Sequence, residues 1–167
     1  MSKTSLTLGF VPLTDCALLA VAKERGLFEA EGLDVRLSRE ASWANIRDKV
    51  VSGVLDGAHM LAPMALACTL GAEGVTTPMI APMALNVNGS SIGVSTSLAA
   101  QIAALDRDAP PESPRTARTL RRLIEMRRAS ERTLAFAVVF PFSIHAYMLR
   151  YWLAEAGIDP DLDVRLT

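Results

Sequence analysis

The sequence is poor in the residues that build metal centres, disulfide networks and membrane spans. Its 167 residues include only two cysteines, Cys16 and Cys68, and two histidines, His59 and His145. These are too few for a disulfide scaffold or a four-cysteine zinc site, and they leave little for a histidine-rich metal centre. Every apolar run is interrupted well before the roughly 18 residues that a membrane-spanning helix needs. We therefore expect no metal, no cofactor and no transmembrane segment.

A strong charge of either sign is also missing. The formal net charge is −1 and half of the residues are hydrophobic. The near-neutral charge gives no whole-chain electrostatic footprint for nucleic acid, so we expect no direct contact with it. The apolar content argues against general disorder, and the length is enough for one domain, or for one lobe and part of another.

The common catalytic motifs are absent as well. The sequence has no P-loop, no G-x-G-x-x-G, no H-E-x-x-H and no G-x-S-x-G nucleophile elbow. Ser143 and His145 are only two residues apart, and no acidic residue is evidently placed to orient the histidine. We predict that the protein is not an enzyme. Residues 5–11 alternate like a strand and follow Met1 almost directly, without a secretory leader. If Met1 is the true start, we expect a cytoplasmic location.

The segments that follow alternate between strand and helix patterns. Strands are expected at residues 6–11, 34–37, 55–59, 79–86, 91–95, 134–140 and 163–167, with a turn at Asn88-Gly89. Helices are expected at residues 15–25, 43–51, 64–70, 98–105, 116–132 and from residue 143 or 145 to 156. This order predicts an α/β fold. A Pro-rich, charged stretch at 106–114 divides the chain into a first lobe (1–105), a linker with an Arg-rich helix (106–132) and the beginning of a second lobe (133–167). We interpret the arginines of the linker helix as a solvated face that pairs with Glu125 and Glu131. The alternative is a partner-binding or RNA-facing role, but the segment has no aromatic residues between its arginines.

Several segments place polar side chains where a strand turns into a helix or a loop. Thr14 begins such a turn. Either Thr14 or Asp15 caps the following helix, or the free backbone N–H groups at the helix start bind an anion. Trp43 follows the expected cap Ser42, and its indole N–H is either a ligand donor or part of the core. His59 reads more readily as a core histidine than as a ligand. If the strands are parallel, these turns converge on one cleft at their carboxyl ends.

Two further segments complete the candidate site. Asn88 and Ser90 lie in a turn whose polar groups either contact a ligand or only build the turn. Ser143 and His145 lie where the apolar run 134–140 gives way to a helix, which repeats the arrangement of the first two turns. An anion would favour His145 as a hydrogen-bond donor or in its protonated form.

A set of these motifs resembles the nitrate- and bicarbonate-binding solute receptors. The matching blocks are GFVPLTDCA (9–17), AKERGLF (22–28), EGLDV (31–35), EASW (40–43), RDK (47–49), DGAHMLAP (56–63) and RYWLA (150–154). The resemblance implies a type II periplasmic-binding-protein fold, of which this chain holds lobe one and the truncated start of lobe two. It also implies ligand contacts from Trp43, from His145 with Ser143 nearby, and from the turn at Asn88–Ser90. Relatives commonly carry Gln or Asn after the glycine of that turn, and Ser90 departs from the pattern.

The function implied by the resemblance is the binding of nitrate, nitrite or bicarbonate. We expect a cytoplasmic nitrate or nitrite sensor, whose partner is an RNA-binding antiterminator. The alternative is the substrate-binding component of a nitrate or bicarbonate ABC transporter, whose partner is the permease. An enzyme related to thiamine-pyrimidine synthesis and a truncated fragment without binding function remain open.

Overall fold

The computed structural model describes residues 4–72, 74, 76–87, 89–106, 117–128 and 133–167. The chain forms two compact units, Met1–Asn88 and Gly89–Thr167. Each unit is described by itself below.

The first unit is built on a parallel three-stranded sheet. Its strands are β1 (Thr4–Phe10), β2 (Leu33–Arg39) and β3 (Gly57–Ala58), in the order β2-β1-β3. The register pairs Thr4 with Leu33 at the start of β1 and Phe10 with Arg39 at its end. The strands expected at residues 6–11, 34–37 and 55–59 are therefore confirmed, although β3 is shorter than the expected segment.

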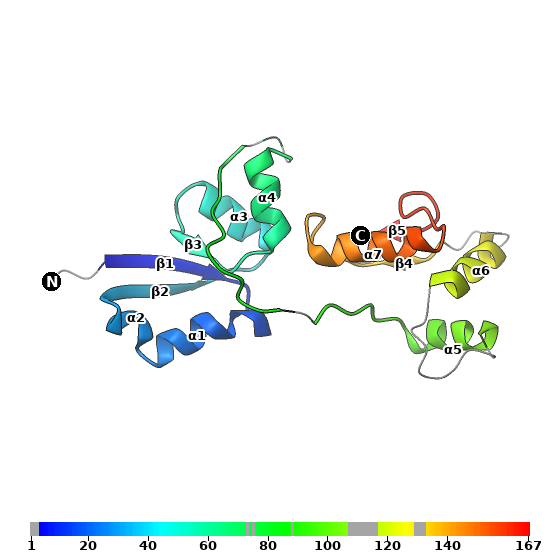
Figure 1. Ribbon diagram of the computed structural model, residues 1–167, viewed down its shortest axis with the longest axis horizontal. Helices are drawn as coiled ribbons and strands as arrows, with labels where there is room; N and C mark the ends of the chain where they lie inside the picture. Colours follow the sequence, from blue (N-terminus) through cyan, green and yellow to red (C-terminus); the bar gives the residue numbers. More distant parts are fainter. Residues whose placement is uncertain (1–3, 73, 75, 88, 107–116, 129–132) are drawn as a thin grey trace. The chain divides into compact units, whose positions relative to one another are not determined.

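Helices cover both faces of this sheet (Figure 1). A 3₁₀ turn (Thr14–Cys16), α1 (Ala17–Glu24) and α2 (Leu27–Ala30) connect β1 to β2, and α3 (Trp43–Val51) and α4 (Ala62–Leu70) follow β2 and β3. In Figure 1, α1 and α2 lie on one side of the sheet and α3 and α4 on the other. The buried apolar residues come from β2, from the α3 and α4 side and from the loop before β3: Val35, Trp43, Ile46, Leu55, Met64, Ala67 and Cys68. None of the α1 residues is buried, so the core of this unit lies mainly under α3 and α4.

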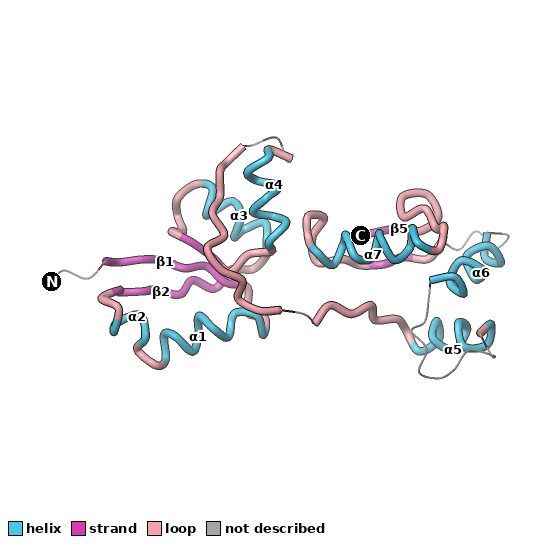
Figure 2. Tube along the Cα trace, in the orientation of Figure 1, coloured by secondary structure: helices cyan, strands magenta, loops and turns pink. Residues whose placement is uncertain are grey.

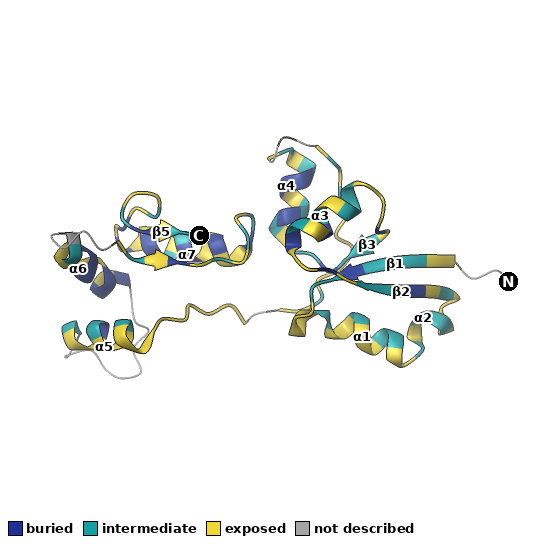
Figure 3. Ribbon diagram, turned by 180° about the vertical axis from the view of Figure 1, so that it is seen from behind, coloured by how far each residue is buried: buried dark blue, intermediate teal, exposed yellow. Residues whose placement is uncertain are grey.

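The second unit packs three helices around a small parallel sheet. The helices are α5 (Thr96–Leu105), α6 (Ala117–Arg128) and α7 (Ile144–Glu155), and the strands are β4 (Ala135–Phe136) and β5 (Arg165–Leu166). Figure 3 shows the buried faces of α6 and α7 in dark blue. One buried apolar cluster joins the three helices and β4, and Leu166 of β5 packs against it: Ile102, Ala117, Leu120, Leu123, Ile124, Phe136, Leu149, Leu153, Ala156, Ile158 and Val164.

Two of the expected strands are wrong. Residues 76–87 and 89–95 carry no strand pairing in the described part of the chain and run as loop (Figure 2). A strand exists only when a neighbour pairs with it, and Pro78 and Pro82 cannot donate backbone hydrogen bonds to such a neighbour. The apolar run 134–140 likewise contributes only Ala135–Phe136 to the sheet, because β5 is a short partner.

The unit boundary differs from the division expected from composition. Helix α5 was expected in the first lobe and α6 in a linker, but Ile102 of α5 and Leu120 of α6 share the core of the second unit. Core packing, rather than loop composition, therefore decides which elements form one unit here. How these units map onto the lobes of a longer protein stays a prediction.

The Arg-rich helix α6 is amphipathic. Its buried apolar residues are Ala117, Leu120, Leu123 and Ile124, whereas Met126 and the arginines Arg118, Arg121 and Arg122 are exposed. Arg121 pairs with Glu125 at 3.0 Å, as expected for a solvated face, and its Nη1 also donates to the Ala156 carbonyl at 3.4 Å. The other expected partner, Glu131, lies outside the described residues. None of the helices within the described residues has the length and apolar character that a bilayer crossing requires.

Leu153 is a sensitive point of the second core because its side chain is fully buried. We expect Leu153→Ala to lower the free energy of unfolding of this unit by about 2–5 kcal/mol, since the cavity is only partly refilled. Leu162→Ala makes the same chemical change at a side chain that is 81% exposed, and we expect it to cost less than about 0.5 kcal/mol. Urea unfolding of both variants checks this; equal losses would contradict the assigned core.

Candidate functional site

The carboxyl ends of the three strands in the first unit meet at one edge. The Glu40 N–H donates to the Phe10 carbonyl at 2.8 Å, and the His59 N–H donates to the Gly9 carbonyl at 2.9 Å. The chain that leaves β2 and the chain that leaves β3 are thus both tied to the end of β1. Because the strand order places β2 and β3 on opposite sides of β1, this edge is where open α/β sheets bind ligands.

Helix α3 begins at this edge with Trp43. The Ser42 hydroxyl accepts a hydrogen bond from the Asn45 N–H at 3.1 Å, so the cap expected from the sequence is confirmed. Trp43 is the first helical residue and is 8% exposed. The helix start offers unpaired backbone N–H groups and the positive end of the helix dipole beside the indole. These are features that an anion can use.

Just before α3 begins, the buried carboxylate of Glu40 binds a lysine of that helix. The Glu40 side chain is 3% exposed; its carboxylate accepts hydrogen bonds from Lys49 Nζ at 2.7 Å and from the Ser38 hydroxyl at 2.9 Å. The hydrogen bond from Lys49 is the main reason that the pKa of Glu40 lies below its ordinary value. Lys49 lies on α3, six residues after Trp43. The pair therefore connects the end of β2 to the helix that carries the indole.

His59 follows β3 and lies against Trp43. Its side chain is 5% exposed, and the two ring centroids are 5.1 Å apart at an interplanar angle of 72°. The Nε2 atom lies 3.9 Å from the Asp15 carboxylate, and Nδ1 has no hydrogen-bond partner among the described residues. Burial lowers the pKa of His59, and the Asp15 carboxylate opposes this. The sequence favoured a core histidine here, and the structure places that histidine in the core beside the candidate ligand wall.

Thr14 is exposed in the 3₁₀ turn after β1. The interpretation that Thr14 or Asp15 caps the following helix is wrong, because α1 begins after Cys16 and no side chain caps it. The 3₁₀ turn shifts the helix start by two residues and takes both side chains out of the capping position. Asp15 faces His59 instead.

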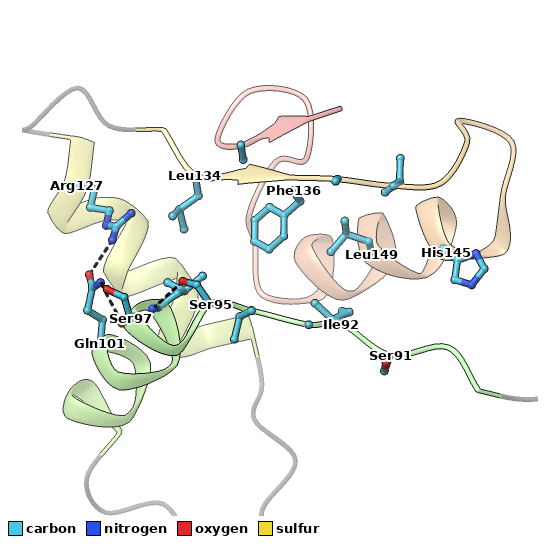
Figure 4. Close-up of a pocket in the computed structure, with 16 residues that line it drawn as sticks. Ser91, Ile92, Ser95, Ser97, Gln101, Arg127, Leu134, Phe136, His145 and Leu149 are labelled. Carbon is cyan, nitrogen blue, oxygen red and sulfur yellow. Dashed lines mark hydrogen bonds between the residues drawn. The ribbon is translucent and has the colours of Figure 1, made fainter. Parts of the chain in front are cut away.

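The second unit contains a cavity of about 430 Å³. Its lining is formed by Ser91, Ile92, Gly93, Val94, Ser95, Ser97, Leu98, Gln101, Arg127, Leu134, Ala135, Phe136, Ala137, Val138, His145 and Leu149. Figure 4 shows His145 at one end and Arg127 with Gln101 at the other. Arg127 Nη2 donates to Gln101 Oε1 at 2.7 Å, and Gln101 donates in turn to Ser97. The cavity thus has an apolar middle with polar groups at both ends.

Ser143 and His145 take opposite positions at the start of α7. Ser143 is fully buried and accepts a hydrogen bond from the Ala146 N–H at 3.1 Å, so its oxygen caps the helix. His145 is exposed and lines the cavity. Ser90 is exposed in the loop that precedes the cavity, and Asn88 lies outside the described residues.

The candidate residues therefore fall into two groups, one in each unit. Thr14 and Trp43 belong to the first unit, and Ser90, Ser143 and His145 belong to the second. Sequence reasoning did not assign roles to Glu40 and Lys49, although their opposite charges flank Ser42 and Trp43. Among the described residues, no group of three His, Cys, Asp or Glu side chains is placed to hold a metal ion.

The comparison with family models covers the whole chain. Residues 1–167 match the model of the NMT1-like family. The chain belongs to this family. The α/β units described above are accordingly those of a periplasmic-binding-protein-like fold.

Individual relatives agree with this assignment. A nitrate import ATP-binding protein, NrtC of Synechocystis sp., is 40% identical over 99% of this chain, and the bicarbonate-binding protein CmpA of Synechococcus elongatus is 33% identical over 97% of it. The crystal structure of the periplasmic nitrate-binding protein NrtA from Synechocystis superposes with a TM-score of 0.81, at 34% identity over 99% of this chain. The chain spans 23% of the NrtC relative, 35% of CmpA and 41% of the NrtA structure.

The Glu40–Lys49 pair generates a prediction about pH. Because the folded-state pKa of Glu40 is lowered, its contribution to stability is present above the ordinary value of 4.5 and is lost as the pH falls through the folded-state value. We expect Lys49→Met to remove this contribution and to destabilise the first unit at pH 7 by about 1–3 kcal/mol, since the buried carboxylate loses its main partner.

Urea unfolding between pH 7 and pH 3 measures both effects. The control is the double variant Glu40→Gln/Lys49→Met, in which Lys49→Met should cost less than it does alone. Parallel stability curves for the wild type and Lys49→Met would contradict the role of the pair.

Proposed function

We propose that this chain is part of a protein that binds a small oxyanion, nitrate or nitrite first and bicarbonate as the alternative, without transforming it. The observation that carries the proposal is Trp43 at the capped start of α3, on the carboxyl edge of the sheet, in a chain that matches the NMT1-like family over its whole length. The names of the relatives, which include nitrate-binding and bicarbonate-binding proteins, support this substrate class.

The chemistry of the first-unit edge suits a small anion. A nitrate ion is planar and carries a single, delocalised charge. The indole offers a flat apolar wall and one N–H donor, while the helix start supplies backbone donors and a partial positive charge. In the second unit, His145 is exposed at the cavity and offers an imidazole donor there.

We further propose that the longer protein works as a component of an ABC transporter. The relatives named above are described as a nitrate import ATP-binding protein, a bicarbonate-binding protein and a periplasmic nitrate-binding protein. In this case the protein that it binds is the permease of the transporter or the ATP-binding subunit. The sensor role, with an RNA-binding antiterminator as partner, and the cytoplasmic location stay predictions; co-purification of the partner and cell fractionation would test them.

A thermal-shift titration of this chain with nitrate, nitrite and bicarbonate tests the anion proposal. A ligand that binds only the folded form raises the melting midpoint by mass action, so we expect a saturable rise with one of the three anions and none with chloride. A cooperative melt without any rise would contradict the proposal for this chain.

Trp43→Phe keeps the flat wall and removes the N–H donor. Losing a hydrogen bond to a charged ligand costs about 1.5–3 kcal/mol, so we expect the anion Kd to rise tenfold or more. The matched control is Trp152→Phe, which makes the same change at the chain's other tryptophan and should leave the Kd unchanged. Calorimetry measures both, and equal effects of the two substitutions would contradict a contact from Trp43.

A further inference from the structure

The buried imidazole of His59 has no part in the anion contacts proposed above, yet it lies directly against Trp43. The ring centroids are 5.1 Å apart in an edge-to-face arrangement, which is a favoured geometry for aromatic pairs. The His59 backbone N–H is bound to the Gly9 carbonyl. The backbone of His59 is therefore tied to the central strand of the sheet, whereas the indole belongs to the first residue of a helix.

The surroundings of His59 select its neutral form. Nε2 lies 3.9 Å from Asp15, whose side chain is half exposed in the 3₁₀ turn after β1. A neutral imidazole carries one N–H, and placing it on Nε2 directs it toward the carboxylate and leaves Nδ1 without a proton. Nδ1 is buried and has no acceptor among the described residues, so a second proton on this atom would be unsatisfied.

Burial and the Asp15 carboxylate act on the pKa of His59 in opposite directions. Burial is the main cause that lowers the pKa of His59 below 6.5, and the Asp15 carboxylate raises it by a smaller amount. Within the described part of the chain, Asp15 is the charged group that acts on the His59 ring. Near neutral pH the ring is uncharged, so it acts by packing rather than by attracting the anion.

We propose that His59 is a positioning residue of the oxyanion site. Its backbone is tied to the end of β1, and its neutral imidazole, beside Asp15, fixes the orientation of the Trp43 indole. This inference rests on the proposed role of Trp43 in anion binding. The three contacts of His59 come from three separate segments: Gly9 of β1, the 3₁₀ turn and α3. His59 thus connects the Trp43 indole to the end of β1 and to the 3₁₀ turn that carries Asp15.

The emission of Trp43 tests the coupling without any anion. Trp152→Phe leaves Trp43 as the sole tryptophan of the chain. In this background we expect His59→Gln to shift the emission to longer wavelength and to increase quenching by acrylamide, because the indole loses its packing partner. We expect His59→Phe, which restores an aromatic ring, to return both properties to the parent values. Emission and quenching of His59→Gln that coincide with those of the parent would overturn the proposal.

A pH titration of the same emission separates positioning from a general loss of packing. We expect the parent to titrate with a midpoint below 6.5, His59→Phe to lose this titration, and Asp15→Asn to move the midpoint further down, because the carboxylate that favours the charged ring is gone. Asp15 is exposed, so its substitution keeps the test valid if His59 variants fold poorly. His145→Gln removes the chain's other histidine and should leave the titration unchanged; a titration that His145→Gln abolishes would overturn the assignment.

The effect on binding is measured with nitrate by calorimetry. We expect His59→Gln to raise the Kd about threefold to tenfold when Trp43 is present and to have no further effect in the Trp43→Phe variant, since His59 acts through the indole. An equal effect in both backgrounds would overturn the proposal. A parent chain that binds no anion would reject the proposed function, whereas the emission experiments would still decide the coupling of His59 to Trp43.

Discussion

Two backbone hydrogen bonds at the end of β1 determine the arrangement of the candidate site in the first unit. The Phe10 carbonyl receives the chain that leaves β2, and the Gly9 carbonyl receives the chain that leaves β3. His59 makes one of these hydrogen bonds itself, and Trp43 lies three residues after Glu40, which makes the other. The backbone hydrogen bonds therefore place both rings. A Cβ at Gly9 would lie 2.5 Å from the Leu55 Cδ1 atom, so a larger residue here would require the Leu55 side chain to move.

The electrostatics of this edge depend on dipoles more than on net charge. The buried carboxylate of Glu40 is neutralised by Lys49, and His59 is kept uncharged by burial. The start of α3 and the indole N–H are the donors of the proposed anion site, and the half-exposed Asp15 carboxylate lies 3.9 Å from the neutral His59 at the same edge. A chain with a net charge of −1 can therefore still offer a local site for a small anion.

At the start of α7 in the second unit, one polar side chain caps the helix and another is exposed. Ser143 is turned inward and its oxygen is used by the backbone of α7, while His145, two residues later, faces the cavity. The cap must lie against the first turn, and the helical rotation then carries the second following residue to another side. The two residues looked equivalent as candidate ligands, but only one of them has its polar atoms available.

The sequence by itself determined the α/β class, most helix limits and the three strands of the first unit. The cap at Ser42 and the helix ends at Gly71 and Gly157 could be predicted because they depend on hydrogen bonds and backbone angles within a few residues. Only the tertiary structure decided which apolar runs become strands, since residues 79–86 and 91–95 find no partner among the described residues. It also decided that Asp15, Trp43 and His59 meet, because they are up to 44 positions apart and only the pairing of β1 with β2 and β3 brings their segments to one edge. Local bonding is encoded within a few neighbouring residues, whereas burial and strand pairing depend on residues far away in the chain.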